Sequence, residues 1–564
     1  MPKSPSLNQP VEDALKGVAL TDFSGMLNSE LDILDLPLNA WADVSNFKIV
    51  KGKAVGRSGY QVLKALAAIA DGLAFFYDSA LARRLVAWVN GDIYSVDLTT
   101  YTLTLVEAGT YTAGRRIAHC VLNNILYYSD GSTIRNDGGG NTSGISYYNP
   151  VAGTFGAVYT SGTAATIQTP ACYWMCAYNG ALVIGNVTYS DTLVKGPDTL
   201  LWSNVLDPTT IVGTNLFKVG NGQGGVIKCV TPFRVGAEGV SPYSALFVAK
   251  TTTTYMMTGA LTPGTFAEVL LSGAIGCTDG YTVQAVPKAD ESGRRTTQIF
   301  WLGSDRQVWS TDGISANPMT LNIQNEFRNW IADRISANAN QEFGSYLDVA
   351  SQHYVLDVGG NRQYCYDYFN NGWTKYNGRP DGIWAAGKDA SSQDVVFMVD
   401  RANANLCQMD INTTDNGTAI APYFKTAAIH GGDPLEDKTW HKVYGFWATD
   451  TSPLTVTATA RLGQGATCTV AMQPADLAPG TFSFWDTAIW DVDLWSSSDS
   501  VDYIPMQGKA RLVVRPDNAP RYLMKTSTIQ LVVGQAATDT GRMEVLAVFV
   551  QYMPGGNARH APFI

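Results

Sequence analysis

The sequence of 564 residues has few charged residues and few of the residues that commonly perform catalysis. Charged side chains make up 16% of the chain, and its five histidines are His119, His353, His430, His441 and His560. GxSxG, HExxH and Walker A patterns are absent, and none of the histidines falls in a catalytic motif. We therefore expect a protein without enzymatic activity and without a cofactor.

Long apolar runs are also missing. The sequence contains no run of about 18 apolar residues, the length that a membrane-spanning helix needs, so we expect no membrane span. Residues 1–10 are polar and lack the apolar core of a secretory signal.

Cysteine spacing gives no sign of a metal site. The eight cysteines are Cys120, Cys172, Cys176, Cys229, Cys277, Cys365, Cys407 and Cys468. None forms a CxxC pair, and Cys172 and Cys176 have no second ligand pair at zinc-finger spacing. We expect reduced core residues, as in a bacterial cytosol or a particle assembled there. The acidic residues between 491 and 502 do not follow the EF-hand spacing, and a solvated loop is favoured over a Ca²⁺ site.

A glycine-rich pattern is present but lacks its usual context. Gly220, Gly222 and Gly225 satisfy GxGxxG. The following VIKCVTPF is rich in β-branched residues and contains a proline, so no helix N-terminus is available for a phosphate. We expect a flexible loop here.

The chain length, the glycine and proline content and the net charge indicate the broad class of protein. With 54 Gly and 24 Pro the chain has many turns, which favours an all-β protein, and its length predicts two or more domains. The net charge of -10 argues against tight binding of nucleic acid, which needs clustered Lys and Arg. It does not exclude a protein through which nucleic acid passes.

One hairpin unit recurs between residues 85 and 412. Three copies have two-residue turns, Asn90-Gly91, Asn123-Asn124 and Asn179-Gly180, where type I′ geometry needs positive φ. Looser copies are LFVAK-TTT-TYMMTG, IFWLG-SDR-QVWSTDG, HYVLDV-GGN-RQYCYDY and VVFMVD-RANA-NLCQMD. Seven copies over residues 86–412 give 327/7, or about 47 residues each, the length of a propeller blade.

The repeats predict a β-propeller of six to seven blades, with a pair of β-sandwiches as the alternative. We expect a polar arm at 1–20, a segment at 21–84 that packs on the propeller or platform, the propeller at 85–431, and a β-sandwich-like platform domain at 432–564. The change near 431–434 predicts a protease-sensitive boundary. In the platform, Val545, Ala547 and Phe549 alternate with Leu546, Val548 and Val550, which predicts a central strand covered on both faces.

Two segments depart from the repeat. From Gly138 to Ser190 the chain has no charged residue, which predicts either a protruding loop at a channel mouth or subunit contact, or an irregular surface insertion. The residues proposed for it are Gly138, Gly139, Gly140, Tyr147, Tyr148 and Pro150. Later, Ile323, Phe327, Trp330, Ile331 and Ile335 are spaced as one face of an amphipathic helix, which Asn322 could cap.

The N-terminal segment DFSGMLNSELDILDLPLNAWADVSNFKIVKGKAVGRSGY resembles tail nozzle and DNA-stabilisation proteins of short-tailed bacteriophages. Its β-type runs around Lys51-Gly52-Lys53 predict a hairpin. The residues of this N-terminal motif are Gly25, Asn28, Pro37, Trp41, Asn46, Gly52, Arg57 and Gly59. The passage at 307–314 with the helix after it, and the closing VQYMPGG, resemble the same family in the same order.

This resemblance implies a structural virion protein in the phage tail, assembled in the host bacterial cytoplasm. It implies a homohexameric ring that binds the head-tail adaptor and tail fibres or spikes, and whose channel retains and conducts viral double-stranded DNA without sequence-specific binding. Two alternatives remain: a receptor- or carbohydrate-binding propeller, and a propeller glycosidase, for which residues 310–313, Ser-Thr-Asp-Gly, give only a fragment of an Asp-box.

Overall fold

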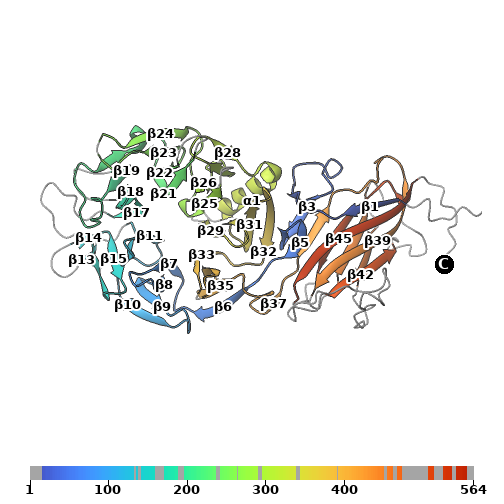
Figure 1. Cartoon of the computed structure of the whole chain (residues 1–564), viewed down its shortest axis with the longest axis horizontal. Helices are drawn as coiled ribbons and strands as arrows, with labels where there is room; N and C mark the ends of the chain where they lie inside the picture. The colour runs from blue at the N-terminus through green and yellow to red at the C-terminus, as the bar shows by residue number, and fades with distance from the viewer. Residues whose placement is uncertain are drawn as a thin grey trace, which may run out of the picture. The chain divides into compact units, whose positions relative to one another are not determined.

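The chain folds into two compact units, which are described separately. The computed structural model describes residues 16–131, 135–136, 142–158, 171–188, 196–236, 242–262, 264–289, 295–337, 343–389, 391–449, 454–461, 467–472, 506–513, 525–535 and 541–554. Unit 1 comprises Met1–Tyr60, Phe369–Arg379 and Asp410–Ile564, and unit 2 comprises Gln61–Tyr368 and Pro380–Met409. The described residues form mostly strands, as expected of an all-β protein (Figure 1).

In the described residues of unit 2, seven antiparallel sheets of three or more strands follow one another along the chain. The first is β7 (Ala70–Tyr77), β8 (Arg83–Val89), β9 (Asp92–Val96) and β10 (Leu103–Glu107). The second is β11 (Ala118–Leu122), β12 (Ile125–Ser129), β15 (Ser146–Asn149) and β16 (Thr154–Ala157), with the short pair β13 (Arg135–Asn136) and β14 (Thr142–Ser143) beside it in sequence. The third is β17 (Cys172–Tyr178), β18 (Ala181–Val187), β19 (Gly196–Trp202) and β20 (Leu216–Lys218).

The remaining sheets repeat this meander. The fourth is β21 (Ile227–Val235), β22 (Tyr243–Lys250), β23 (Thr254–Thr258) and β24 (Ala267–Ser272), and the fifth is β25 (Gln284–Ala289), β26 (Arg295–Leu302), β27 (Val308–Thr311) and β28 (Ala316–Pro318). The sixth has three strands in unit 2, β29 (Gly344–Asp348), β30 (His353–Asp357) and β31 (Arg362–Asp367). The seventh is β33 (Gly382–Lys388), β34 (Asp394–Asp400), β35 (Asn405–Met409) and β6 (Tyr60–Ala65).

These sheets are the blades of a β-propeller. Figure 1 shows them arranged in a circle, and the first strands of neighbouring sheets contact one another around the centre. The circle closes where β33 contacts β7. In the last blade the outer strand, β6, comes from the N-terminal side of the chain. The predicted propeller is confirmed, with seven blades, and each predicted hairpin lies in a different blade.

The Asn turns have the backbone that the sequence predicts. Asn90 and Gly91 join β8 to β9 with φ of 52° and 90°. The φ angles are 51° and 63° for Asn123 and Asn124, and 47° and 76° for Asn179 and Gly180. Positive φ at both turn residues matches the right-handed twist of the strands and fixes their register.

The core of unit 2 lies between adjacent blades. Between the first two, Trp88 is fully buried and its ring centroid lies 5.5 Å from those of His119 and Tyr128. Similar clusters of buried apolar side chains join the second blade to the third, the third to the fourth, the fourth to the fifth and the seventh to the first. Each of the first four sheets therefore buries both faces against its neighbours.

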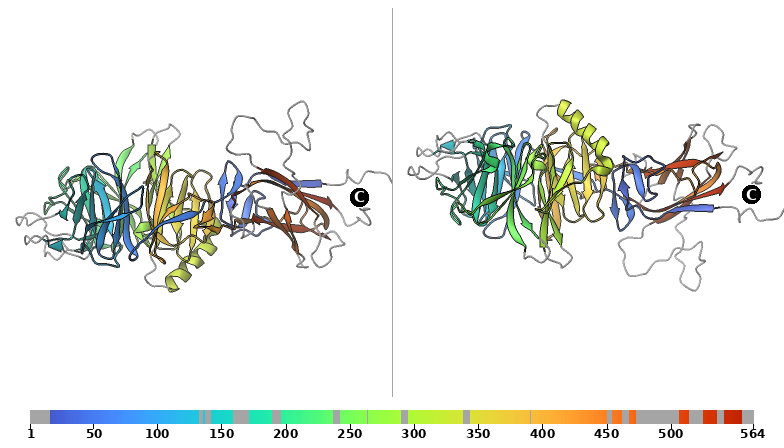
Figure 2. Two further views of the ribbon diagram at one scale, coloured as in Figure 1. Left: turned by 90° about the horizontal axis from the view of Figure 1, so that it is seen from below. Right: turned by 90° about the horizontal axis from the view of Figure 1, so that it is seen from above.

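The predicted helix is present as α1 (Gln324–Ala337), which follows the short helix η4 (Leu321–Ile323) and lies on one face of the propeller in Figure 2. Ile323, Phe327 and Ile331 of the predicted face are buried. Two further short helices are η2 (Val219–Gly222) and η3 (Gly280–Thr282).

Unit 1 is a sandwich of two sheets, seen as two layers in Figure 2. One contains β4 (Phe47–Val50), β5 (Lys53–Gly56), β45 (Met543–Pro554), β39 (Lys438–Thr449) and β42 (Met506–Val513), with β1 (Lys16–Leu20) on β45 and β43 (Lys525–Thr526) on β39. The other contains β2 (Met26–Leu27), β3 (Ala40–Ser45), β38 (Tyr423–Thr426), β44 (Thr528–Gln535), β40 (Leu454–Arg461) and β41 (Thr467–Met472). Unit 1 also contains β32 (Gly372–Asn377), β36 (Thr414–Asp415) and β37 (Thr418–Ala419).

Several predicted boundaries differ from the structure. The propeller begins near Gln61 and ends at Met409, where the sequence predicted 85–431, because β7 and β8 form its first blade. Residues 21–60 are part of the sandwich, and residues 16–20 of the predicted arm form β1. The two ends of the chain thus build one domain, which a local reading of the sequence does not reveal.

The predictions for the last strand and for the uncharged segment also differ from the structure. β45 is central, pairing with β39 and with β1 and β5, but its alternation breaks at a register shift opposite Phe446 and Trp447. Val545, Val548 and Val550 are buried, whereas Leu546, Ala547 and Phe549 are only partly buried, so β45 is not covered equally on both faces.

In the uncharged segment, Tyr147 and Tyr148 lie in β15, which pairs with β12 and β16, and Pro150 lies in the turn after it. Gly138, Gly139 and Gly140 lie outside the described residues.

Candidate functional site

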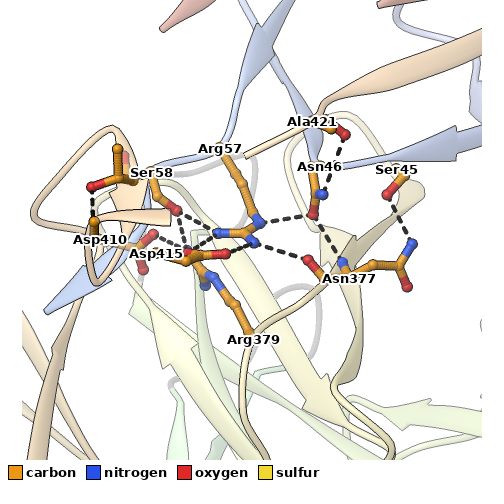
Figure 3. Close-up of polar contacts among 11 residues, drawn as sticks. Ser45, Asn46, Arg57, Ser58, Asn377, Arg379, Asp410, Asp415 and Ala421 are labelled. Carbon is orange, nitrogen blue, oxygen red and sulfur yellow. Dashed lines mark hydrogen bonds and ion pairs between the residues drawn. The ribbon is translucent and has the colours of Figure 1, made fainter. Parts of the chain in front are cut away.

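The N-terminal motif forms a buried polar network in unit 1 (Figure 3). The Arg57 guanidinium donates to both carboxylate oxygens of Asp415, with Nη1–Oδ1 and Nη2–Oδ2 distances of 2.8 and 2.5 Å. Its Nε donates to Asn46 Oδ1 at 2.8 Å, and its Nη2 donates to the Asn377 carbonyl at 2.9 Å. The Arg57 side chain is 1% exposed. A planar guanidinium suits this arrangement because its five donors point in fixed directions.

A second arginine extends the network. Arg379 donates to Asp410 Oδ1 at 2.5 Å and to the Ser58 carbonyl at 2.7 Å. The Arg57 and Arg379 guanidinium carbons lie 5.8 and 4.9 Å from the ring centroid of Tyr376. Each of these segments adjoins a point where the sequence passes between units, at 60/61, 379/380 and 409/410. The network therefore joins the unit 1 segments at three of the four points where the chain passes between the units.

Other residues of the N-terminal motif shape the backbone around this network. Gly52 has φ of 78° in the predicted β4–β5 hairpin. A Cβ at Gly59 would lie 1.9 Å from the Thr414 carbonyl oxygen, and a Cβ at Gly25 would lie 2.8 Å from the Ala40 nitrogen. Both glycines therefore permit close backbone contacts.

The three remaining motif residues lie in β3 and in the segment before it. Trp41 is buried, and its ring centroid lies 5.4 Å from that of Phe424. Asn28 accepts two backbone N–H groups, and the Pro37 carbonyl accepts the Ala40 N–H. All eight motif residues are thus structural in unit 1, and none presents a reactive group.

Unit 2 has a polar cavity of about 790 Å³ beside the centre of the propeller. Its walls are formed by Gly114, Arg115, Arg116, Tyr173, Trp174, Asn186, Lys228, Thr278, Asp279, Gly280, Tyr281, Ile335 and Phe343. These residues come from the second to sixth blades and from α1. We call it the face pocket.

A packed cluster of aromatic and charged side chains forms one wall of the face pocket. The Arg116 guanidinium carbon lies 3.9 Å from the Tyr281 ring centroid, and the Trp174 centroid lies 4.7 Å from that of Tyr281. Arg116 also donates to the Phe343 carbonyl at 2.8 Å and lies 3.6 Å from Asp279. Burial raises the pKa of Tyr281, so the phenol is neutral at physiological pH.

A smaller cavity of about 220 Å³ occupies the centre of the propeller, with walls from the first strands of all seven blades. Both cavities are lined by Arg116, Trp174, Gly280 and Tyr281. Because a DNA major groove alone is about 12 Å wide, the centre of one propeller cannot conduct a duplex.

Arg401 lies near the same cluster. Burial and the neighbouring Arg116 lower the pKa of Arg401 to about 9, which leaves its guanidinium charged at neutral pH.

The glycine-rich sequence surrounds a buried lysine. Val219 and Gln223 carbonyl oxygens accept hydrogen bonds from Lys250 Nζ, and Lys250 is fully buried. Gly220, Gly222 and Gly225 have φ of 65°, 84° and 79°, so each uses a backbone that other residues rarely adopt. β21 follows, as the sequence predicts, so no helix terminus is available for a phosphate. The ammonium occupies the space that the loop encloses.

Other chemical candidates have structural roles in the described residues. Asp312 accepts the Ile314 N–H in the turn after β27, so the Asp-box fragment shapes a turn. The seven described cysteines are free thiols, and burial raises the pKa of Cys172 and Cys229 to about 12. No group of three or more His, Cys, Asp or Glu side chains within the described ranges could hold a metal ion. Residues 491–502 lie outside these ranges.

Membrane-spanning helices are likewise absent from the part of the chain that the structure describes.

The sequence analysis did not single out the face pocket. The feature of the sequence that could have indicated this pocket is the adjacent pair Arg115-Arg116, because charged residues are few in this chain. The partners Asp279 and Tyr281 come from a blade that follows more than 160 residues later, and no local pattern connects them.

Comparisons with known proteins give no family. The chain matches no family model and no curated protein sequence. Similar solved structures include the extracellular domain of a one component system from B. thetaiotaomicron, virginiamycin B lyase from Staphylococcus aureus and an auxiliary nutrient binding protein from Bacteroides ovatus. Their identities are 10%, 8% and 10%, and their TM-scores are 0.38, 0.38 and 0.33.

The aligned regions cover 70%, 62% and 65% of this chain, and 43%, 98% and 76% of those chains. This chain therefore spans less than half of the first protein. We assign the propeller from its sheets and draw no functional argument from these structures.

Proposed function

We propose that this protein is a structural component of the tail of a short-tailed bacteriophage, where copies form a ring-shaped nozzle. The proposal rests on the resemblance of the N-terminal motif, and one observation supports it most. Asn46 and Arg57, two residues that carry the resemblance, bind each other and the segments at 377 and 415 in one buried network. The motif thus has a definite physical role in unit 1.

In this proposal, the ring encloses the DNA channel between subunits. The propeller centre contains only a cavity of about 220 Å³, so the lumen is a surface that several copies share. Six copies of a -10 chain carry 6 × -10, or -60, and this charge repels phosphate. The lumen then conducts DNA without the counterion release that makes binding tight. The ring binds the head-tail adaptor and tail fibres, and it works without catalysis or a cofactor.

Native mass spectrometry tests the assembly. We expect an oligomer of six copies of 60.8 kDa, or about 365 kDa, in the purified protein or after addition of the adaptor ring. A chain that stays monomeric under both conditions would contradict the nozzle.

Duplex binding tests the passive channel. The free chain should have no appreciable affinity for duplex DNA at physiological salt. Strong binding that weakens steeply as salt rises would contradict a passive lumen.

A carbohydrate-binding propeller is the second candidate, because the face pocket combines cations with aromatic side chains. A glycosidase has less support, since Asp312 is engaged in its own turn. Incubation with host surface polysaccharide separates these functions: binding without new reducing ends favours a receptor-binding protein, whereas released reducing ends would favour the enzyme.

A further inference from the structure

We propose that the face pocket binds a sugar that carries a carboxylate, such as a uronic acid residue of a polysaccharide. This inference does not rest on the nozzle, because it concerns the propeller of a single chain. The pocket holds three cations, Arg115, Arg116 and Lys228, and one carboxylate, Asp279. Its formal charge is therefore +3 - 1, or +2, in a chain whose net charge is -10.

Two of these cations are available to a ligand. Arg115 is exposed, and its one hydrogen bond among the described residues runs from Nη1 to the Tyr173 hydroxyl, at 3.3 Å. Lys228 is half-buried, and its ammonium has no ion-pair partner among the described residues. A carboxylate between Arg115 and Lys228 would form charge-assisted hydrogen bonds, which are stronger than those between neutral groups.

The carboxylate in the pocket does not neutralise these two cations. Asp279 Oδ1 accepts the Tyr281 N–H at 3.0 Å, and Oδ2 accepts the Phe343 N–H at 3.0 Å. Arg116 lies 3.6 Å from this carboxylate, and Arg401 also interacts with it electrostatically. The Asp279 carboxylate therefore faces Arg116 and Arg401, and the positive charges of Arg115 and Lys228 have no ion pair with it among the described residues.

Aromatic and amide groups lie in the same pocket. Tyr173 is 37% exposed, and a Cβ at Gly131 would lie 2.5 Å from its ring, so the ring packs closely on that glycine. Trp174 is half-buried beside Tyr281. Aromatic rings provide flat apolar surfaces on which the C–H face of a sugar ring can lie.

Asn186 supplies an acceptor for a hydroxyl. Its Nδ2 donates to the Ile227 carbonyl at 3.1 Å, whereas its Oδ1 has no partner among the described residues. The pocket thus suits a compact ligand with an anionic group, hydroxyl donors and an apolar face on one ring. A uronic acid has all three, whereas a nucleotide separates its phosphate from its flat base. The volume of about 790 Å³ lies in the range of ligand pockets.

Binding to the purified full chain tests this assignment. The probes are trigalacturonic acid and its methyl ester, which have the same rings but differ in charge, with a short oligothymidylate as the nucleic-acid probe. Calorimetry should show saturable binding of the acid, with at least about tenfold weaker binding of the ester. The double variant R115A/K228A should lose at least about tenfold in affinity, and Y173A should weaken binding without changing charge.

A matched variant, R234A/K288A, removes two exposed cations elsewhere on unit 2 and should bind like the wild type. Melting temperatures of all variants report whether they fold. The assignment is overturned if the folded wild type does not bind the acid, if acid and ester bind equally, if R115A/K228A binds normally, or if the oligothymidylate binds more tightly than the acid.

Discussion

Arg57 and Asp415 lie 358 residues apart in the sequence and form a two-pronged ion pair at 2.8 and 2.5 Å. The Arg57 side chain is 1% exposed and that of Asp415 is 12% exposed. Because the propeller sequence lies between them, unit 1 can complete this network only after the chain has been made through residue 415. The sandwich is therefore a domain whose stability depends on contacts distant in sequence.

Removing Arg57 should strongly destabilise unit 1. The variant R57A leaves Asp415 without its partner in a buried site, and we expect a loss of about 3 to 5 kcal/mol in the free energy of unfolding. K53A, in the adjacent strand, breaks a surface pair with Glu544 whose side chains are 47% and 34% exposed, and should cost about 0 to 1 kcal/mol. Urea unfolding measures both, and equal effects would contradict the role given to Arg57.

Lys250 should stabilise the glycine-rich loop. K250M removes the ammonium and leaves the Val219 and Gln223 carbonyls without their donor, at a cost of about 1 to 3 kcal/mol for each. K218M is the control, because Lys218 is 59% exposed and lies 3.6 Å from Asp198, so its loss should cost less than about 1 kcal/mol. Thermal unfolding distinguishes the two, and a neutral K250M would show that the lysine does not hold the loop.

The stability of unit 2 should fall as pH rises. Burial and the nearby Asp381 raise the pKa of Asp357 from 3.8 to about 8. Between these two pKa values, Asp357 is protonated in the folded state and ionised in the unfolded state. Its contribution to the free energy of unfolding is therefore fully present below about pH 4 and is lost as the pH rises from about 4 to about 8. The slope is at most about 1.4 kcal/mol per pH unit.

The variant D381N removes the second cause of this shift and should make the decrease with pH shallower. D312N changes an exposed aspartate in a turn and should leave the slope unchanged. Urea unfolding from about pH 4 to about pH 8 measures the slopes. A wild-type stability that rises through this range, with D381N no different, would contradict the assignment of Asp357.

Protease cleavage near residue 436 should not separate domains. Leu435 is 87% exposed and Glu436 is also exposed, so Glu-specific protease should cut there. The fragment of 564 - 436, or 128, residues should stay bound, because β38 before the cut and β39 after it belong to the two sheets of one sandwich. Gel filtration of the nicked protein tests this, and a fragment that elutes alone would support the boundary near 431.

The sequence predicted the propeller well because its signals are local. Pairs such as Asn90-Gly91 determine a turn within two residues, and apolar runs beside them determine the strands, so seven hairpins could be recognised. The same local reading missed the extent of the sandwich. β1 pairs with β45 across more than 520 residues, and nothing in either strand identifies its partner.

The sequence revealed residues of the buried network but not the face pocket. Asn46 and Arg57 were identified through a resemblance, which gave no indication that they bind each other. Arg115 and Lys228 come from different blades, and their shared cavity exists only once the propeller closes. Tyr147 and Tyr148 were wrongly assigned to a loop because the segment around them has no charged residue. A strand inside a blade can also lack charged residues, so this property does not distinguish a loop from a strand.

Imaging of labelled virus particles tests the central proposal most directly. Fab fragments raised against the purified propeller should be added to phage particles from a culture that carries this gene, and the particles averaged by electron microscopy. The nozzle predicts Fab density in a ring around the tail, below the head-tail adaptor and on the tail axis. Fab density confined to the capsid or to single peripheral fibres, or particles that lack the protein, would contradict it.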